Sequence, residues 1–263
     1  MNRRDFGRGV LGASLAGAVT GAVEAQGRKK RVLTITQAAG FRHSSIGTAA
    51  QTVRNLGDYT GKWEVVGEAA TAEEVAKAVT ANGLRGIDLV FFANTTGNLG
   101  FTPEGHKAFY DWIDAGGAWA GVHSSSDTFH GDPAFLNLVR GEFQTHGPQV
   151  EVTIYNQDPK HPACAHIGAS FKIFDEIYEF KNWDRSRVHV LLTMKQHPQK
   201  KQMQGDFPVA WTNRVGKGRM FYTSLGHREE VYMNGLYLDH LRGGISWALG
   251  LAQGDDRVSN PLI

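Results

Sequence analysis

The hydrophobic and polar positions of residues 32–122 alternate between short apolar runs and amphipathic segments. The apolar runs are rich in β-branched and aromatic residues, so they predict buried strands at residues 32–36, 63–68, 87–94 and 118–122. The segments between them predict helices at residues 44–56, 71–83 and 102–117. Strands that alternate with helices in this way predict an α/β fold, in which helices cover both faces of a mostly parallel sheet.

The pattern becomes more antiparallel in character in the second half of the chain. Alternating apolar and polar positions predict strands at residues 149–156 and 188–195. A hairpin is predicted for residues 208–213 and 219–224, with its turn at residues 216–218, and a last helix for residues 235–251. We therefore expect a single domain at residues 26–263, with its core at about residues 30–251 and an antiparallel extension of the sheet.

The first 25 residues differ from the rest of the chain. Arg3 and Arg4 precede a mildly apolar stretch, residues 10–23, that is too short and too rich in Gly and Ala to span a bilayer stably. This arrangement predicts a signal for the twin-arginine export machinery, cleaved after Ala25, that would deliver the protein to the periplasm or beyond. A disordered basic tail and a retained anchor are the alternatives. We expect no stable membrane span in the mature chain.

Composition narrows the classes of partner and cofactor. The formal net charge is +2, which predicts no strong electrostatic attraction to nucleic acid. Cys164 is the only cysteine, so no intramolecular disulfide can form. The sequence contains no phosphate-binding P-loop, and we expect no nucleotide cofactor.

Several of the eleven histidines fall in loops or at predicted strand ends, namely His43, His123, His130, His146 and His227. In a parallel sheet the carboxyl ends of the strands meet at one edge, where ligands bind. The loops at residues 37–43, 94–98 and 123–130 should therefore form one mouth. Histidine is suited to proton transfer near neutral pH and is a common metal ligand.

Three motifs contain candidate carboxylates, and two of them lie beside these histidines in sequence. Asp127 comes four residues after His123, which is a weak signal for acid–base or metal chemistry. Glu229 comes two residues after His227, so the pair could supply the base and the orienting group of a catalytic set. The run "FDEIYEF" places Glu176 among aromatic residues, as sugar sites often do, although a strand with one charged face has the same period.

Taken together, "GFRHSS", "GGAWAGVHSSSDTF", "FDEIYEF", "PVAWTNRVGKGRMFYTSLGH" and "HLRGGISWALG" resemble the trehalose-utilisation, ThuA-like family. The resemblance covers about residues 30–251. It implies the flavodoxin-like three-layer sandwich of the class I glutamine amidotransferase-like superfamily. That superfamily has a cysteine after the fourth strand, where this chain has His123, and a later His-x-Glu pair that His227 and Glu229 match. The resemblance therefore implies that the position of the site is retained and that glutamine amidotransferase chemistry is not.

The resemblance also implies carbohydrate chemistry, on trehalose or another glycoside and in particular on 3-keto sugars made by a partner sugar dehydrogenase. The main hypothesis is an enzyme that uses acid–base or metal-assisted chemistry on such a sugar. The expected catalytic residues are His123, Asp127, His227, Glu229 and Glu176. The expected sugar contacts are Phe41, Arg42, His43, Ser124, His146 and Tyr178. A divalent metal ion would take its ligands from His43, His123, His146 and His227.

Two alternatives remain open from the sequence. The first is a non-catalytic sugar-binding protein or an accessory subunit of a sugar dehydrogenase. The second is a metal-dependent hydrolase of another substrate, supported by fold analogy alone.

Overall fold

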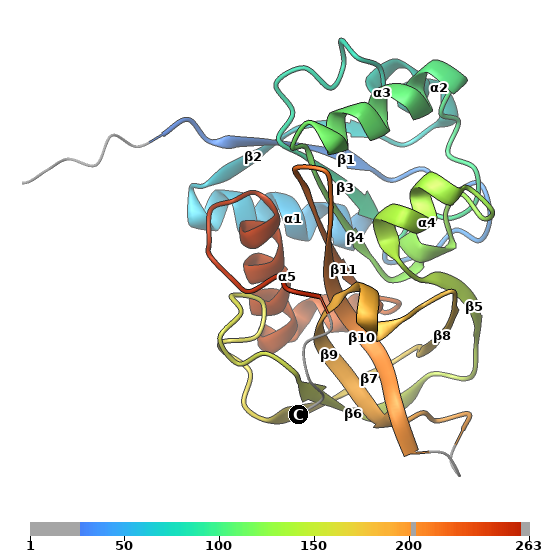
Figure 1. Cartoon of the computed structure of the whole chain (residues 1–263), viewed down its shortest axis with the longest axis vertical. Coiled ribbons are helices and arrows are strands. Elements are labelled where there is room, and N and C mark those ends of the chain that lie inside the picture. Colours follow the sequence, from blue (N-terminus) through green and yellow to red (C-terminus); the bar gives the residue numbers. More distant parts are fainter. Residues whose placement is uncertain (1–26, 201–203, 259–263) are drawn as a thin grey trace, which may run out of the picture.

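A nine-stranded sheet forms the centre of the computed structural model, which describes residues 27–200 and 204–258 (Figure 1). Its strand order is β2-β1-β3-β4-β11-β10-β9-β6-β7. The parallel strands are β1 (Lys30–Ile35), β2 (Trp63–Ala69), β3 (Leu89–Ala93), β4 (Ala118–Val122) and β11 (Gly218–Thr223). The antiparallel strands are β6 (Val150–Asn156), β7 (Ser170–Asp175), β9 (His189–Gln196) and β10 (Gln204–Val215). A small separate sheet pairs β5 (Glu142–His146) with β8 (Tyr178–Lys181).

Helices cover both faces of the large sheet, so the domain is a three-layer sandwich (Figure 1). One face carries α1 (Ile46–Thr60) and α5 (Gly235–Ala248). The other face carries α2 (Ala72–Ala78), α3 (Pro103–Asp114) and α4 (Pro133–Val139). Short 3-10 helices occupy three connections, as η1 (His123–Asp127), η2 (Arg185–Arg187) and η3 (Glu229–Met233).

Successive residues of the parallel strands point to opposite faces and belong to different cores. Phe91 of β3 packs in the core below α1 and α5, whereas Phe92 stacks on Phe109 of α3 with 6.2 Å between ring centroids. Every residue of β3 and β4 is buried. Strands covered on both faces must be apolar throughout, which is why these runs were recognisable in the sequence.

The predicted fold class, the parallel first half and the antiparallel extension are confirmed, and two helices differ from expectation. The helix predicted over residues 71–83 ends at Ala78, because Val79 leaves the helical region and the chain folds back until Gly83 lies against the carbonyl of Ala78. Helix α4 was not predicted. Its start was legible in the sequence, since Asp132 caps the backbone N–H of Ala134 at 2.8 Å and a proline follows it.

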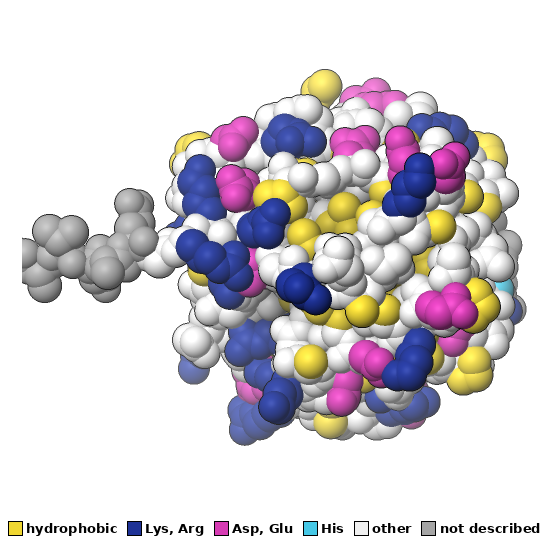
Figure 2. All heavy atoms as spheres, turned by 90° about the horizontal axis from the view of Figure 1, so that it is seen from above, with side chains coloured by type: hydrophobic (Ala, Val, Ile, Leu, Met, Phe, Trp, Pro, Cys, Tyr) yellow, Lys and Arg dark blue, Asp and Glu magenta, His cyan; other side chains and the backbone are white. Residues whose placement is uncertain are grey.

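The predicted export signal lies outside the described residues. Within them, none of the helices is long and apolar enough to cross a bilayer. On the face shown in Figure 2, Lys and Arg side chains stand among Asp and Glu side chains, and neither sign covers the face.

His240 of α5 makes the stability of the fold depend on pH. The imidazole is fully buried, and its Nδ1 lies 2.8 Å from the carbonyl of Ala163. Burial lowers the pKa of His240 to about 3, against about 6.5 for an exposed histidine. Between these two pKa values the unfolded chain therefore binds a proton at His240 that the folded protein does not bind. The stabilisation that depends on the neutral ring is complete above pH 6.5 and is lost as the pH falls toward 3.

We predict that His240→Gln, which keeps an N–H donor, flattens this pH dependence. Between pH 6 and pH 4 the free energy of unfolding should fall less steeply with decreasing pH, by up to about 1.4 kcal/mol per pH unit. Urea unfolding at a series of pH values measures the slope. His166→Gln, on the loop that contacts the start of α5, controls for the loss of an imidazole as such. An unchanged slope in His240→Gln would contradict the prediction.

Candidate functional site

His123 follows β4 directly, at a sharp turn from strand to 3-10 helix. Its φ of 45° lies in the left-handed region, which is uncommon for a residue with a side chain. Gly121 makes room for the turn, because a Cβ there would overlap Ser125 Oγ and the ring of Trp119. The Tyr222 hydroxyl donates to the His123 carbonyl at 2.7 Å and holds the turn from the neighbouring strand β11. The turn places the His123 imidazole at the carboxyl end of the sheet.

A hydrogen bond to the backbone fixes the tautomer of His123. Its Nδ1 lies 2.9 Å from the carbonyl oxygen of Ser224, which can only accept, so Nδ1 carries the hydrogen. In the neutral ring, Nε2 then presents a lone pair. The Tyr178 hydroxyl lies 2.9 Å and His227 Nδ1 3.2 Å from this Nε2. The most buried imidazole of the site is therefore oriented as an acceptor.

His227 is positioned by the peptide of the preceding residue, Gly226. The Gly226 N–H donates to Asp175 Oδ2 at 2.7 Å. Its carbonyl accepts from Ser45 Oγ and from Asn94 Nδ2, each at 3.0 Å. The φ of Gly226 is 119°, where a residue with a side chain would be strained. The loops after β1, β3, β7 and β11 are thus joined at one peptide unit.

Glu176, the first residue after β7, places its carboxylate among three imidazoles. Its Oε1 lies 3.3 Å from His227 Nδ1 and 3.5 Å from His123 Nε2, while Oε2 lies 3.0 Å from His146 Nδ1. Burial favours the neutral acid, but the neighbouring imidazoles of His123 and His227 outweigh it and lower the pKa of Glu176 below its usual range. The hydrogen bond to Glu176 in turn raises the pKa of His227. Glu176 is therefore a stable anion and a weak base.

His43 completes the cluster from the loop after β1. Its Nδ1 lies 3.2 Å from Ser124 Oγ, and its ring meets those of His123 and His227 edge-on, with centroids 4.8 and 5.2 Å away. Burial, with help from the neighbouring His123 and His227, lowers the pKa of His43 to about 3. The ring is neutral at physiological pH. Phe41 packs edge-on against it at 4.8 Å and is itself 68% exposed.

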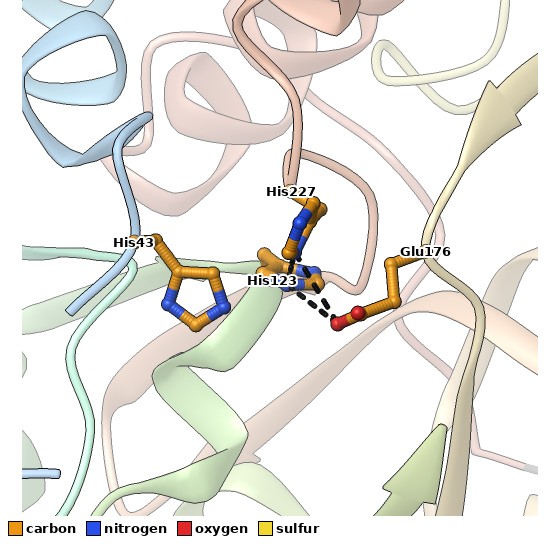
Figure 3. Close-up of side chains that lie close together, drawn as sticks. All are labelled: His43, His123, Glu176 and His227. Atoms are coloured by element: carbon orange, nitrogen blue, oxygen red, sulfur yellow. Dashed lines mark hydrogen bonds and ion pairs between the residues drawn. The ribbon is translucent and has the colours of Figure 1, made fainter. Parts of the chain in front are cut away.

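Four side chains converge on one point, as Figure 3 shows for His43, His123, Glu176 and His227. One ligand atom from each lies within 4.8 Å of the others. Neutral imidazoles around an ionised carboxylate can hold a divalent cation, and they can also move or share a proton. A surface hollow of about 660 Å³, lined by residues of β6 and β9 such as Tyr155 and Lys195, lies apart from this cluster. Access to the cluster is at Phe41 and at His146, whose side chain is 46% exposed.

The remaining residues singled out from the sequence lie at different distances from this cluster. Tyr178 and Ser124 contact it directly, through His123 and His43. Asp127, on the same 3-10 turn as His123, pairs with His130. Glu229, which the His-x-Glu motif predicted as the partner of His227, is hydrogen-bonded to Ser44. The carboxylate beside His227 is that of Glu176. Arg42 lies exposed at the rim, with its guanidinium 3.4 Å from the carbonyl of Thr36.

The groups that position the site were not found from the sequence. Asn94 is buried with a φ of 48° and donates to Ser45 Oγ at 2.7 Å as well as to Gly226. An asparagine at the end of an apolar strand suits a left-handed turn, and that was the available signal. Asp175 gave no signal separate from its neighbour Glu176. Its contact with Gly226 spans 51 residues of sequence, which local patterns do not reveal.

We predict that Asn94→Gly, which keeps the left-handed backbone but removes the amide, lowers the free energy of unfolding by about 1–3 kcal/mol. Asn213→Ala is the matched control, because its amide also donates to two acceptors, the carbonyls of Asn137 and Leu138, away from the site. Both variants should lose stability in urea unfolding. Only Asn94→Gly should shift the ring resonances of His227 and His43 in ¹⁵N-histidine spectra. Equal spectral changes in the two variants would contradict a positioning role for Asn94.

Comparison with known structures gives the same architecture. A ThuA-like protein from Parabacteroides merdae superposes with a TM-score of 0.70 at 18% identity, over 89% of this chain and 93% of that one. A ThuA-like protein from Bacteroides uniformis gives 0.64 at 22% identity, over 84% and 91%. A β-galactosidase from Bacillus circulans sp. alkalophilus gives 0.54 at 11% identity, over 84% of this chain but 31% of that one. At these identities the likeness is one of fold.

The comparison with curated proteins finds no match. A family model does match, over residues 31–248, which is most of the described domain and includes every residue of the cluster. Its description is ThuA, trehalose utilisation. The chain therefore belongs to the ThuA family.

Proposed function

We propose that the protein is an enzyme of carbohydrate metabolism that acts on an oxidised sugar, of the 3-keto class, at the His43–His123–Glu176–His227 cluster. Membership of the trehalose-utilisation family supports a role in carbohydrate metabolism. The observation that carries the enzymatic interpretation is the cluster itself, a buried carboxylate beside the imidazoles of His123 and His227 at the carboxyl ends of the strands, with His146 on its other oxygen. A simple sugar-binding site needs amides and hydroxyls more than a set of coupled ionisable groups.

A ketone in a sugar ring makes the neighbouring C–H bonds acidic. Removal of a proton from such a carbon requires a base near that carbon and a positive group at the ketone oxygen, where negative charge develops. His227 suits the first role, because its hydrogen bond to Glu176 raises its pKa and favours the imidazolium. Burial raises the pKa of Tyr178, so its hydroxyl stays protonated and can donate to the same oxygen.

His146 is suited to the base. Its side chain is half exposed at the entrance, and its Nδ1 is anchored by Glu176 Oε2 at 3.0 Å. With the hydrogen on Nδ1, Nε2 is left as the proton acceptor. Glu176 holds both His146 and His227, one on each carboxylate oxygen, so one anion orients the base and the electrophile.

We predict that the protein exchanges the hydrogen next to the ketone of a 3-keto glycoside, such as 3-keto-trehalose, with solvent deuterium. Proton NMR in D₂O measures this exchange whatever product is finally released. Glu176→Gln and His146→Ala should each slow it by about 10²–10⁴-fold, the usual contribution of positioned acid–base groups. His106→Gln, on α3, is the control for a histidine outside the cluster.

Exchange at the wild-type rate in both variants would contradict this assignment. Calorimetric binding of a glycoside that is recovered unchanged, with no deuterium incorporated, would favour a binding protein or an accessory subunit instead.

A further inference from the structure

The ligand atoms of His123, His227 and Glu176 form a nearly equilateral triangle. His123 Nε2 and His227 Nδ1 are 3.2 Å apart, His227 Nδ1 and Glu176 Oε1 are 3.3 Å apart, and Glu176 Oε1 and His123 Nε2 are 3.5 Å apart. In a tetrahedral site with metal–ligand bonds of about 2.0–2.1 Å, neighbouring ligand atoms lie about 3.3 Å apart. The triangle therefore has the dimensions of one face of such a site.

The partners behind the imidazoles leave the required lone pairs pointing inward. Ser224 O takes the hydrogen of His123 Nδ1 and leaves a lone pair on Nε2, and when Ser124 Oγ accepts from His43 Nδ1 it does the same for that ring. Histidine ligands in metal sites usually make this kind of second hydrogen bond, which sets tautomer and ring direction. The ring of His123 is thus prepared as a ligand by the fold, and Ser124 is placed to prepare that of His43.

A cation satisfies this arrangement more evenly than a proton. The hydrogen on His227 Nδ1 faces two acceptors, His123 Nε2 and Glu176 Oε1, which lie 3.5 Å apart, and the Tyr178 hydroxyl is a second donor, 2.9 Å from His123 Nε2. A cation in the centre of the triangle meets all three atoms at bonding distance. The single negative charge of Glu176 then faces the charge of the cation in place of the proton on His227.

We propose that His123, His227 and Glu176 bind one divalent transition-metal ion, with His43, whose ligand atom lies within 4.8 Å of theirs, as a more distant fourth group, and that this ion takes over the electrophilic role of the His227 proton. The set of three nitrogens and one oxygen favours the zinc class, because magnesium and calcium require oxygen ligands. The inference rests on the proposed function for its chemical role, although the binding itself does not. Tyr178, which lies 2.9 Å from His123 Nε2, is then free to donate to the sugar.

The test is metal binding by the full-length protein after it has been stripped with a chelator and dialysed. Elemental analysis after reloading with Zn²⁺ should give one ion per chain, and Co²⁺ should give a visible absorption band from a four-coordinate site. Zn²⁺ should also raise the thermal midpoint of the wild type, because a ligand that binds only the folded state stabilises it. Glu176→Gln and His227→Ala should lose the ion and the thermal shift.

Two further variants test how far Zn²⁺ binding depends on the cluster. Ser124→Ala removes only the partner of His43 and should weaken Zn²⁺ affinity by about 10–100-fold. His106→Gln leaves the cluster untouched and should bind one ion as the wild type does, which excludes adventitious binding to other histidines. Circular dichroism shows whether each variant is folded. Absence of stoichiometric Zn²⁺ and Co²⁺ binding in folded wild type, or equal binding by Glu176→Gln and His227→Ala, would overturn the proposal.

The solvent-exchange assay separates this proposal from the proposed function. Stoichiometric metal without exchange on any keto sugar would leave the metal site standing and defeat the proposed function. Full exchange by the stripped protein, with no gain on adding Zn²⁺, would support the proposed function and defeat the catalytic role of the metal, because the proton on His227 would then suffice.

Discussion

The site depends on one peptide unit, that of Gly226. Its N–H donates to Asp175 at the end of β7, and its carbonyl accepts from Ser45 after β1 and Asn94 after β3. Each of these partners lies close in sequence to a residue of the cluster or ends a neighbouring strand, so the spacing of His43, Glu176 and His227 is fixed together. A Cβ at position 226 would collide with the hydroxyls of Tyr232 and Tyr237, so only glycine fits this junction. The loops after β1, β3 and β11 are thereby held together with the end of β7.

Electrostatics sets a second constraint, because one buried anion serves several imidazoles. Burying Glu176 alone would be costly, and the neighbouring imidazoles of His123 and His227 offset that cost and keep it ionised. His43 gains no such partner and stays neutral, since burial and its two neighbours lower its pKa to about 3. The cluster therefore contains both kinds of imidazole that chemistry on a ketone can use, a neutral acceptor and a ring that favours its proton. A stronger base than Glu176 has to come from the rim, where His146 lies.

The sequence predicted the edge of the sheet at which the site lies, and it predicted most of the side chains there. Fully apolar strands such as β3 and β4 are easy to recognise in a sequence. The residues that follow them, such as His123, must then lie together at the edge of the sheet formed by the carboxyl ends of the strands. The partners of each side chain were not predictable. Asp127 and Glu229 are nearest in sequence to His123 and His227, yet Glu176 is their partner, because β7 reaches the site through the antiparallel extension and a contact across 51 residues. Long-range register, rather than local pattern, decides such pairings.

A histidine at the turn after the fourth strand follows from the same geometry. A left-handed residue between a strand and a helix projects its side chain beyond the sheet, which in related folds exposes a nucleophile. Here the Nδ1 hydrogen of His123 is bound by the Ser224 carbonyl, and the Tyr222 hydroxyl donates to the backbone carbonyl of His123. These two hydrogen bonds fix the direction of the Nε2 lone pair. A fixed acceptor is of little use as a leaving group or acyl carrier, but it is what a metal ion or a shared proton requires. The turn thus serves to direct one atom, the Nε2 of His123, and the identity of that atom determines the chemistry.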